Sequence, residues 1–352
     1  MDANNRISVR KGEIVNRGGS EITTPDKAGT LAPKRKPTKK EQLDIIGIEK
    51  FFDRFSSEEA ATAFVEECVW GETPFCPKCG SDNVYESKGG KPMKWRCRAC
   101  WKFFSVRVGT VFEETNLTFK KWLLAIYFML SDRHGVSSVN LSKLLDVKQD
   151  TAWHLEMRIR EAMREDDPPM MRGTVQVDET YIGGIERWKH AKKKLHGDWQ
   201  KGRITVFGLK EGGPGGKVMA FPLKFADIEE IRDGVLDNVH IGSIICTDGH
   251  AAYRGLEDFG YGHEKVEHRI GQYVNDNGGT TNAIESFWAL FKGTYRGTYH
   301  GVSRKHLRRY LDESTYRLNS GKGNGFESIK RVIRGMVGKR LTYEQLTGRK
   351  QD

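Results

Sequence analysis

The sequence predicts a multidomain protein in which a cysteine-containing module and a small helical domain precede an α/β domain with a mixed sheet. Three observations lead to this prediction. Two Cys-x-x-Cys pairs lie in the first third of the chain, and apolar residues recur at helical spacing through residues 117–165. Beyond Pro168 and Pro169, β-branched runs separated by glycine-rich turns are joined by helical patterns, which is typical of α/β domains.

The composition is that of a globular protein with an excess of basic residues. The chain has 352 residues, of which 37% are apolar and 30% charged, and its formal net charge is +11. This length suffices for two or three domains. No stretch approaches the roughly 20 apolar residues of a membrane span, and the N-terminus lacks the apolar segment of a secretory signal. We therefore expect no membrane association and a cytoplasmic location.

Changes in composition place the domain boundaries. Residues 1–43 have almost no apolar periodicity and are expected to form a flexible basic tail. Residues 44–112 should hold one or two short helices and the cysteine module, and residues 113–167 a helical segment that resembles a helix-turn-helix unit. Residues 168–335 are expected to form the α/β domain, and residues 336–352 a C-terminal tail.

The α/β domain carries clear signals for strands and helices. β-branched and aromatic runs predict strands at residues 174–182, 204–209, 218–223 and 243–247. Apolar residues at helical spacing predict helices at residues 227–239 and 282–292. These elements together predict a mixed sheet with helices packed on it.

Four cysteines of the N-terminal module are spaced as metal ligands. They form two Cys-x-x-Cys pairs: Cys76 with Cys79, and Cys97 with Cys100. Thiolates in two such pairs suit tetrahedral Zn²⁺ with no open position, so we expect a structural zinc ribbon and not a redox or catalytic centre.

Cations and aromatic residues alternate around these cysteines. The cations that could bind a phosphate backbone include Lys94, Arg96, Arg98 and Lys102. The aromatic residues of the same stretch could stack on bases, but a small core for the ribbon is the preferred interpretation. The residues concerned are Trp95, Trp101, Phe103 and Phe104.

Three acidic residues of the α/β domain lie where a site could form. Asp178 falls in a predicted central strand, where an unpaired charge is costly to bury, and the strand period sends Glu179 to the opposite face. Asp248 follows an apolar strand, at the end where α/β proteins commonly build sites. Glu285 flanks the apolar stripe of a predicted helix, and Lys292 lies nearly two turns further on the same face.

If these carboxylates converge, they form a hard oxygen site suited to Mg²⁺ or Mn²⁺. Two such ions can activate a water or a 3′-hydroxyl and stabilise the leaving oxygen of a phosphodiester. Periodicity alone favours the alternative, in which the acids are isolated surface residues.

The order of the motifs resembles one family. The cysteine pairs and the helical segment are followed by VDETYIGG at residues 177–184, TDGHAAY at 247–253, TNAIESFWALFK at 281–292, and the basic stretch 297–319. This order resembles that of bacterial insertion-sequence transposases, which join an N-terminal zinc ribbon to a DDE catalytic domain of ribonuclease-H-like fold. The resemblance covers residues 45–335.

The resemblance implies a role for each catalytic position. Asp178, Asp248 and Glu285 correspond to the three metal-binding acids of a DDE transposase, and Lys292 to the basic residue that often lies seven positions after the glutamate. Asn282 is a less favoured alternative to Glu285 as the third metal ligand, because some family members carry Asn near that point. The implied reaction is DNA strand cleavage and strand transfer by two-metal phosphoryl transfer.

The resemblance also implies partners. The ribbon and the helical segment 113–167 would bind the terminal inverted repeats, with target DNA as the second substrate, by a dimer or larger oligomer at the bacterial nucleoid. A basic helix with Lys305, Arg308 and Arg309 could contact DNA, although solvated charge is an equal alternative. Two other functions stay open: a zinc-ribbon DNA-binding regulator whose catalytic fold is silent, and a ribonuclease-H-like nuclease that hydrolyses without joining.

Overall fold

The fold is taken from a computed structural model of the chain. It describes residues 46–88, 93–183, 203–266, 274–275, 278–320 and 325–348. The expected basic tail, residues 1–43, lies outside the described residues. No helix in the described ranges is long and apolar enough to cross a membrane.

The N-terminal half begins with two helices and a small antiparallel sheet. The helices are α1 (Ile48–Arg54) and α2 (Glu58–Trp70), and the strands are β1 (Val84–Glu86), β2 (Trp95–Cys97) and β3 (Phe103–Phe104). Helix α2 begins after Ser57, whose hydroxyl accepts a hydrogen bond from the Ala60 amide. The expected short helices and ribbon are therefore present, in the expected order.

Three further helices form the predicted helical segment. They are α3 (Phe119–Ser131), α4 (Ser138–Leu145) and α5 (Gln149–Met163). Thr118 and Ser137 cap α3 and α4 by accepting hydrogen bonds from backbone amides one turn on. From Leu155 onward α5 is buried on every side, because it packs against α3, α4 and two C-terminal helices. Only the first turn of α5 is therefore exposed, whereas the recognition helix of a helix-turn-helix unit exposes one face along its length to the DNA groove.

The C-terminal half contains the predicted mixed sheet, in the order β6-β5-β4-β7-β8. Its strands are β4 (Thr174–Gly183), β5 (Arg203–Glu211), β6 (Val218–Pro222), β7 (Ile244–Thr247) and β8 (Gly262–Lys265). Strands β4, β5 and β6 pair antiparallel, whereas β7 is parallel to both β4 and β8. Strand β4 is thus central, as expected for the strand that carries Asp178.

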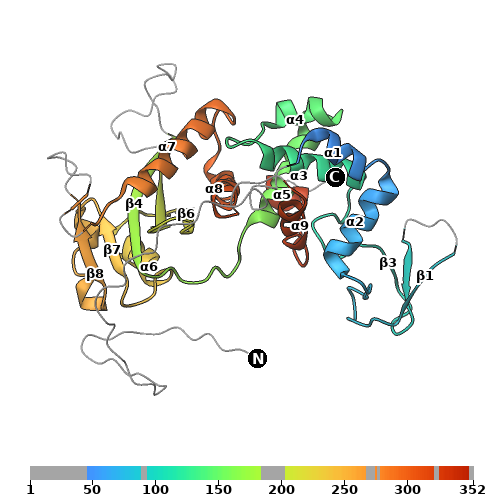
Figure 1. Cartoon of the computed structure of the whole chain (residues 1–352), viewed down its shortest axis with the longest axis horizontal. Helices are drawn as coiled ribbons and strands as arrows, with labels where there is room; N and C mark the ends of the chain where they lie inside the picture. Colours follow the sequence, from blue (N-terminus) through green and yellow to red (C-terminus); the bar gives the residue numbers. More distant parts are fainter. Residues whose placement is uncertain are drawn as a thin grey trace. The chain divides into compact units, whose positions relative to one another are not determined.

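Helices cover both faces of this sheet (Figure 1). On one face, α6 (Ile228–Leu236) packs on the side chains of Val175 and Val177. On the other face, α7 (Asn282–Gly297) and α8 (Arg304–Asn319) share an apolar core with side chains from β4, β5 and β6. Alternate residues of β4 therefore point into different cores.

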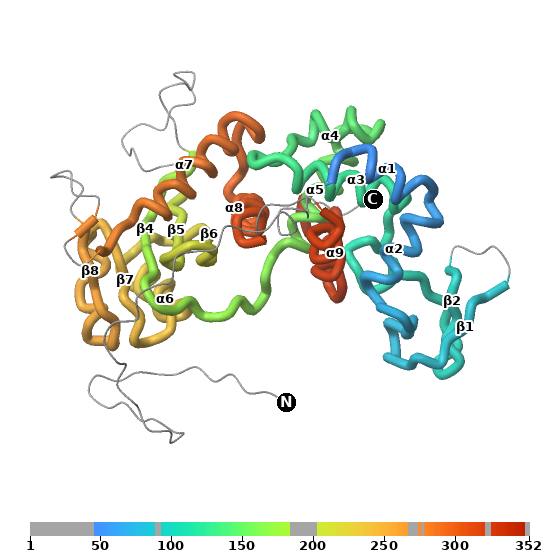
Figure 2. Tube along the Cα trace, viewed as in Figure 1, coloured from blue at the N-terminus to red at the C-terminus, as the bar shows by residue number. Residues whose placement is uncertain are grey.

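The end of the chain returns to the N-terminal helices. Helix α9 (Phe326–Arg334) packs against α2, α3 and α5, and Figure 2 shows it beside α5. Its buried residues Ile329 and Ile333 belong to the core of the N-terminal half and not to that of the sheet. Residues 336–352 were expected to form a tail, but they contain a short helix, α10 (Tyr343–Thr347). Its Leu346 is buried in the core that α7 and α8 share with the sheet.

A buried ionic network joins α5 to α8. Arg160 Nε donates to Glu313 Oε2 at 2.7 Å, and Arg160 Nη1 lies 3.2 Å from Glu156 Oε2. Arg317 pairs with the other oxygen of Glu313, and the Tyr299 hydroxyl donates to the same carboxylate at 3.0 Å. Burial acts to raise the pKa of Glu313, but Arg317 and Arg160 outweigh it and hold that pKa below its usual value.

Glu313→Gln tests this network. The substitution leaves Arg160 and Arg317 without their shared carboxylate, so we expect a loss of about 3–5 kcal/mol in the free energy of unfolding. Urea unfolding of the full chain measures this loss. The matched control is Glu67→Ala, which removes a half-exposed partner of Lys330 and should cost less than about 1 kcal/mol. Equal effects of the two substitutions would contradict a structural role for the network.

Candidate active site and zinc ribbon

The four ribbon cysteines are brought together as predicted. Their sulfur atoms all lie within 4.8 Å of one another, and no other acid, cysteine or histidine cluster in the described ranges meets that criterion. The Cys76 and Cys100 sulfurs are 3.7 Å apart, and those of Cys79 and Cys97 are 3.6 Å apart. Ligands 2.3 Å from a tetrahedral zinc ion lie about 3.8 Å apart, so the set fits Zn²⁺ closely.

The aromatic residues of the ribbon divide between its core and its surface. Phe104 is buried against Trp70, and Trp95 packs edge-on to Trp70 while its indole N–H donates to Glu66. Phe103 is half-buried. Trp101, however, is 62% exposed, so its assignment to the ribbon core was wrong.

The predicted basic contacts of the ribbon have different surroundings. Lys94 is engaged in an ion pair with Glu66 at 3.1 Å. Arg96 stacks on the Phe103 ring, with Cζ 4.9 Å from the ring centroid. Arg98 and Lys102 are exposed.

Asp178 lies on the face of β4 that meets α7. The Trp288 indole N–H donates to Asp178 Oδ2 at 3.0 Å. Two residues earlier on the same face, Gln176 Oε1 accepts from the amides of Ala283 and Ile284, which fixes the first turn of α7 against β4. The side chain of Glu179 points to the other face, next to Tyr253, as the strand period predicts.

Electrostatics links Asp178 to the other predicted catalytic residues. Burial raises the pKa of Asp178 to about 6, and the negative charges of Asp248 and Glu285 act in the same direction. Burial lowers the pKa of Lys292, while the charge of Asp178 acts to raise it. The side chains from β4, the end of β7 and α7 therefore share one electrostatic environment.

The three acids do not form a closed cluster of ligands. Asp248 follows β7, and its Oδ1 accepts from the His250 amide at 3.0 Å. Glu285 is exposed in the first turn of α7, where its Oε1 accepts from the Thr281 hydroxyl at 3.0 Å. Among the described residues, the four cysteines are the one group of three or more potential metal ligands whose ligand atoms all lie within 4.8 Å of one another. The three carboxylates therefore do not meet this distance criterion.

Two supporting residues had no predicted role. Gly208 of β5 lies directly across from Asp178, and a Cβ added there would overlap the Trp288 ring. Trp288 is one of the apolar residues at helical spacing that predict the helix at residues 282–292. A buried indole N–H normally needs an acceptor, and this was the available signal for its contact with Asp178. The absence of a side chain at Gly208 thus gives Trp288 the space to reach Asp178.

The basic residues of α8 are largely engaged within the protein. Arg308 pairs with Asp312 at 2.9 Å, and Arg309 with Glu161 at 3.1 Å. Lys305 is exposed. The α8 surface therefore offers fewer uncommitted cations than its sequence suggests.

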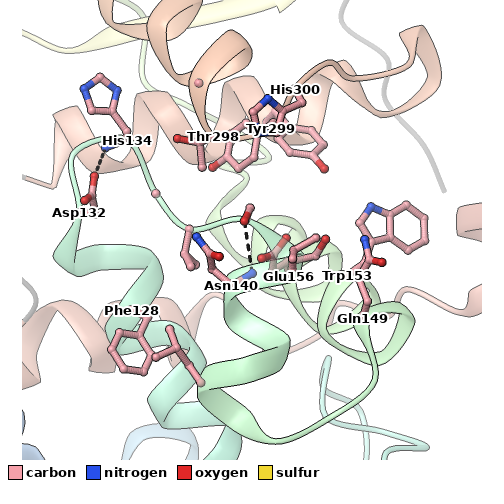
Figure 3. Close-up of a pocket in the computed structure, with 18 of the residues that line it drawn as sticks. Phe128, Asp132, His134, Asn140, Gln149, Trp153, Glu156, Thr298, Tyr299 and His300 are labelled. Carbon is pink, nitrogen blue, oxygen red and sulfur yellow. Dashed lines mark hydrogen bonds between the residues drawn. The ribbon is translucent and has the colours of Figure 1, made fainter.

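A cleft of about 1420 Å³ borders the C-terminal half of α7. Its walls come from α4, α5 and the segment that joins α7 to α8, and Figure 3 shows Trp153 and Glu156 facing it across from Tyr299. His134 also lines the cleft, and its Nδ1 lies 2.9 Å from Thr294 Oγ1 of α7. This cleft provides room for a large ligand beside the helix that carries Glu285 and Lys292.

Zinc removal should unfold the ribbon. In Cys97→Ser we expect loss of bound zinc and earlier proteolysis within residues 71–110, because ligand binding in such a module is folding free energy. Limited proteolysis and metal analysis of the full chain measure both effects. Cys246→Ser, a buried cysteine of β7, is the control and should keep its zinc. Normal zinc content in Cys97→Ser would rule out the tetrahedral site.

Gly208→Ala should displace Trp288 from Asp178. Because the added methyl overlaps the indole, we expect a loss of about 1–3 kcal/mol in the free energy of unfolding. Gly297→Ala is the control, since a Cβ at that helical position meets nothing within 4 Å and alanine favours helix. Thermal unfolding compares the two, and a Gly208→Ala protein as stable as Gly297→Ala would contradict this packing.

Comparisons with known proteins agree with this architecture. Residues 56–102 match the family described as the transposase zinc-ribbon domain, and residues 170–319 match the ISXO2-like transposase domain, a DDE domain. A protein described as an uncharacterized protein in transposable element ISH50 of Halobacterium salinarum is 28% identical over 291 residues, which cover 79% of this chain and 97% of that protein.

Two solved structures show a weaker likeness. One is a pre-cleavage Mos1 transpososome, with 11% identity, a TM-score of 0.26, and coverage of 84% of this chain and 97% of that chain. The other is a simian T-cell lymphotropic virus intasome in complex with the PP2A regulatory subunit B56 gamma, with 13% identity, a TM-score of 0.22, and coverage of 53% and 74%.

The two family matches occur in the predicted order and together cover more than half of the residues. The ribbon cysteines, the mixed sheet and the acids gathered around β4 all lie within them. Over these residues the chain therefore belongs to two transposase families, the transposase zinc-ribbon domain and the ISXO2-like transposase domain, a DDE domain.

Proposed function

We propose that this transposase binds the ends of its element and catalyses metal-dependent DNA strand cleavage and strand transfer, with Asp178, Asp248 and Glu285 as metal ligands. One observation carries the proposal. Burial together with the charges of Asp248 and Glu285 raises the pKa of Asp178 to about 6. Gathering like charges around a buried carboxylate is unfavourable unless a cation neutralises them, which supports a cation site here.

The donor set fits Mg²⁺ or Mn²⁺. Carboxylate oxygens are the ligands that these hard cations prefer. When bound, the ions would activate a water or a 3′-hydroxyl and stabilise the leaving oxygen of the phosphodiester. Because the three carboxylates do not all lie within 4.8 Å, joint ligation requires side-chain movement, for which the exposed Glu285 has room.

The residues around the acids have positioning roles in this proposal. Trp288 holds Asp178 Oδ2, and Gln176 fixes the first turn of α7, so that Glu285 stays near β4. The negative charge of Asp178 acts to raise the pKa of Lys292, so the two side chains interact electrostatically. In this proposal Lys292 would contact a DNA phosphate beside the acids. Glu285 is favoured over Asn282 as the third acid, because only a carboxylate adds the charge that a divalent cation neutralises.

DNA is the proposed partner on grounds of charge and family. The net charge of +11 favours a polyanion, and binding should weaken steeply as salt rises if several Lys and Arg neutralise phosphates. Terminal inverted repeats and target DNA are the two proposed substrates. Because two ends must be joined to one target, we propose a dimer or larger assembly on DNA, at the nucleoid.

Substitution of the acids tests the proposal. Asp178→Asn, Asp248→Asn and Glu285→Gln should each abolish cleavage and joining in Mg²⁺ or Mn²⁺, because each removes a ligand charge. End binding should stay within about threefold, which is less than 1 kcal/mol. The assay uses a labelled element end and a plasmid target, and Glu229→Gln on the exposed first turn of α6 is the control that keeps activity.

Other outcomes separate the rival functions. Nicked ends without joined product would indicate a ribonuclease-H-like nuclease. End binding without any cleavage by the unsubstituted protein would indicate a DNA-binding regulator. An active Glu285→Gln protein together with an inactive Asn282→Ala protein would indicate that Asn282, and not Glu285, is the third metal ligand.

A further inference from the structure

We propose that Trp101 is a DNA-contacting residue whose indole inserts at a base step of duplex DNA, and that the outer face of the zinc ribbon is the surface that binds this DNA. The outer face is defined here by Tyr85, Arg96, Arg98, Trp101 and Phe103. The inference rests on the proposed function in one respect, which is that DNA is the partner.

The two knuckles of the ribbon have the same backbone geometry but different residues. In each knuckle the residue after the second cysteine adopts a left-handed conformation, with φ of 73° at Gly80 and 60° at Trp101. Glycine adopts this conformation without steric cost, whereas a bulky residue does so at a cost. The first knuckle therefore has the residue that the backbone favours, and the second does not.

Packing does not compensate for this cost at Trp101. Its side chain is 62% exposed, whereas Trp95, six residues earlier, packs against Trp70 and hydrogen-bonds Glu66. An exposed indole on an unfavourable backbone contributes little to the fold. A strained backbone conformation that is not offset by packing of the side chain is typical of residues that contact a ligand.

The register of the ribbon sheet builds an aromatic and cationic face next to Trp101. Arg96 of β2 pairs with Tyr85 of β1 on one side and with Phe103 of β3 on the other, so these side chains share one face. The opposite face carries Trp95 and Phe104, which are the aromatic residues of the ribbon core.

Arg96 orients the exposed indole. Its Cζ lies 5.4 Å from the Trp101 ring centroid and 4.9 Å from that of Phe103. Its Nε donates to the Trp101 carbonyl at 3.4 Å, and its Nη1 to the Tyr85 hydroxyl at 3.4 Å. Arg96 therefore contacts both the backbone and the ring of Trp101 before any ligand binds, which reduces the entropy lost on binding.

The charge of this face is complementary to DNA. Arg98 is exposed with Cζ 4.9 Å from the Tyr85 ring centroid, and Lys102, next to Trp101, is also exposed. Guanidinium and ammonium groups bind phosphates, and an apolar or aromatic wedge can enter between base pairs. The outer face thus combines phosphate contacts with one protruding aromatic ring.

Duplex binding by Trp101 variants tests the inference. The full chain is titrated into a fluorescein-labelled duplex that contains the end of its own element, and anisotropy is measured. We expect Trp101→Ala and Trp101→Gly to bind about tenfold more weakly and Trp101→Phe to bind nearly normally, because stacking needs an aromatic ring. Phe225→Ala is the matched control, since Phe225 is 72% exposed and lies outside the ribbon.

Stability of the Trp101→Gly protein separates a binding role from a structural one. Because glycine suits the left-handed backbone, we expect its zinc content and unfolding midpoint to equal or exceed those of the unsubstituted chain. A lower midpoint or lost zinc would show that Trp101 supports the fold, and would overturn the inference.

The remaining outcomes distinguish failure of this inference from failure of the proposed function. If the unsubstituted chain binds the duplex and Trp101→Gly binds equally well, Trp101 makes no contact and the proposed transposase function still stands. If the unsubstituted chain binds no duplex, the proposed function fails as well. Weakened binding only to the single strand of the same sequence would overturn insertion into duplex DNA.

Discussion

The attachment of α7 to β4 is the interaction on which the candidate active site depends. The Gln176 side chain accepts hydrogen bonds from the amides of Ala283 and Ile284 in the first turn of the helix. One turn further on, the Trp288 ring packs over Gly208 and its indole N–H donates to Asp178. These contacts fix both the position and the rotation of α7. Glu285 and Lys292 are thereby held near an acid more than a hundred residues earlier in the chain.

Features that depend on short-range signals were predictable from the sequence, and features that depend on distant pairing were not. Cysteine spacing and β-branched runs predicted the ribbon and the strands of the mixed sheet, except β8, whose sequence GHEK is polar. Gly208 has no local signal, because its role follows from lying across from Asp178. Likewise α9 lies within the range expected for the α/β domain, residues 168–335, but its buried face joins the N-terminal core, a long-range contact without a local signal.

The ribbon aromatics show the same limit in a single motif. Four aromatic residues close together were interpreted as one core, yet the strand period can bury only alternate positions. The register puts Phe104 inside with Trp95 and leaves Phe103 with Arg96. Trp101 lies beyond the strand, where its left-handed backbone, and not the strand period, sets its direction.

The zinc site and the proposed Mg²⁺ or Mn²⁺ site draw their ligands from different kinds of segments. The zinc ligands come from two knuckles within 25 residues, and the sulfurs already lie 3.6–3.7 Å apart in ligand geometry. The acids come from two strands and a helix, and they share an electrostatic environment without reaching joint ligand distance. A structural site must be closed, whereas a site that admits a DNA phosphate must stay open until its ions and substrate arrive. The greater separation of the acids is therefore consistent with a site that is completed by what it binds.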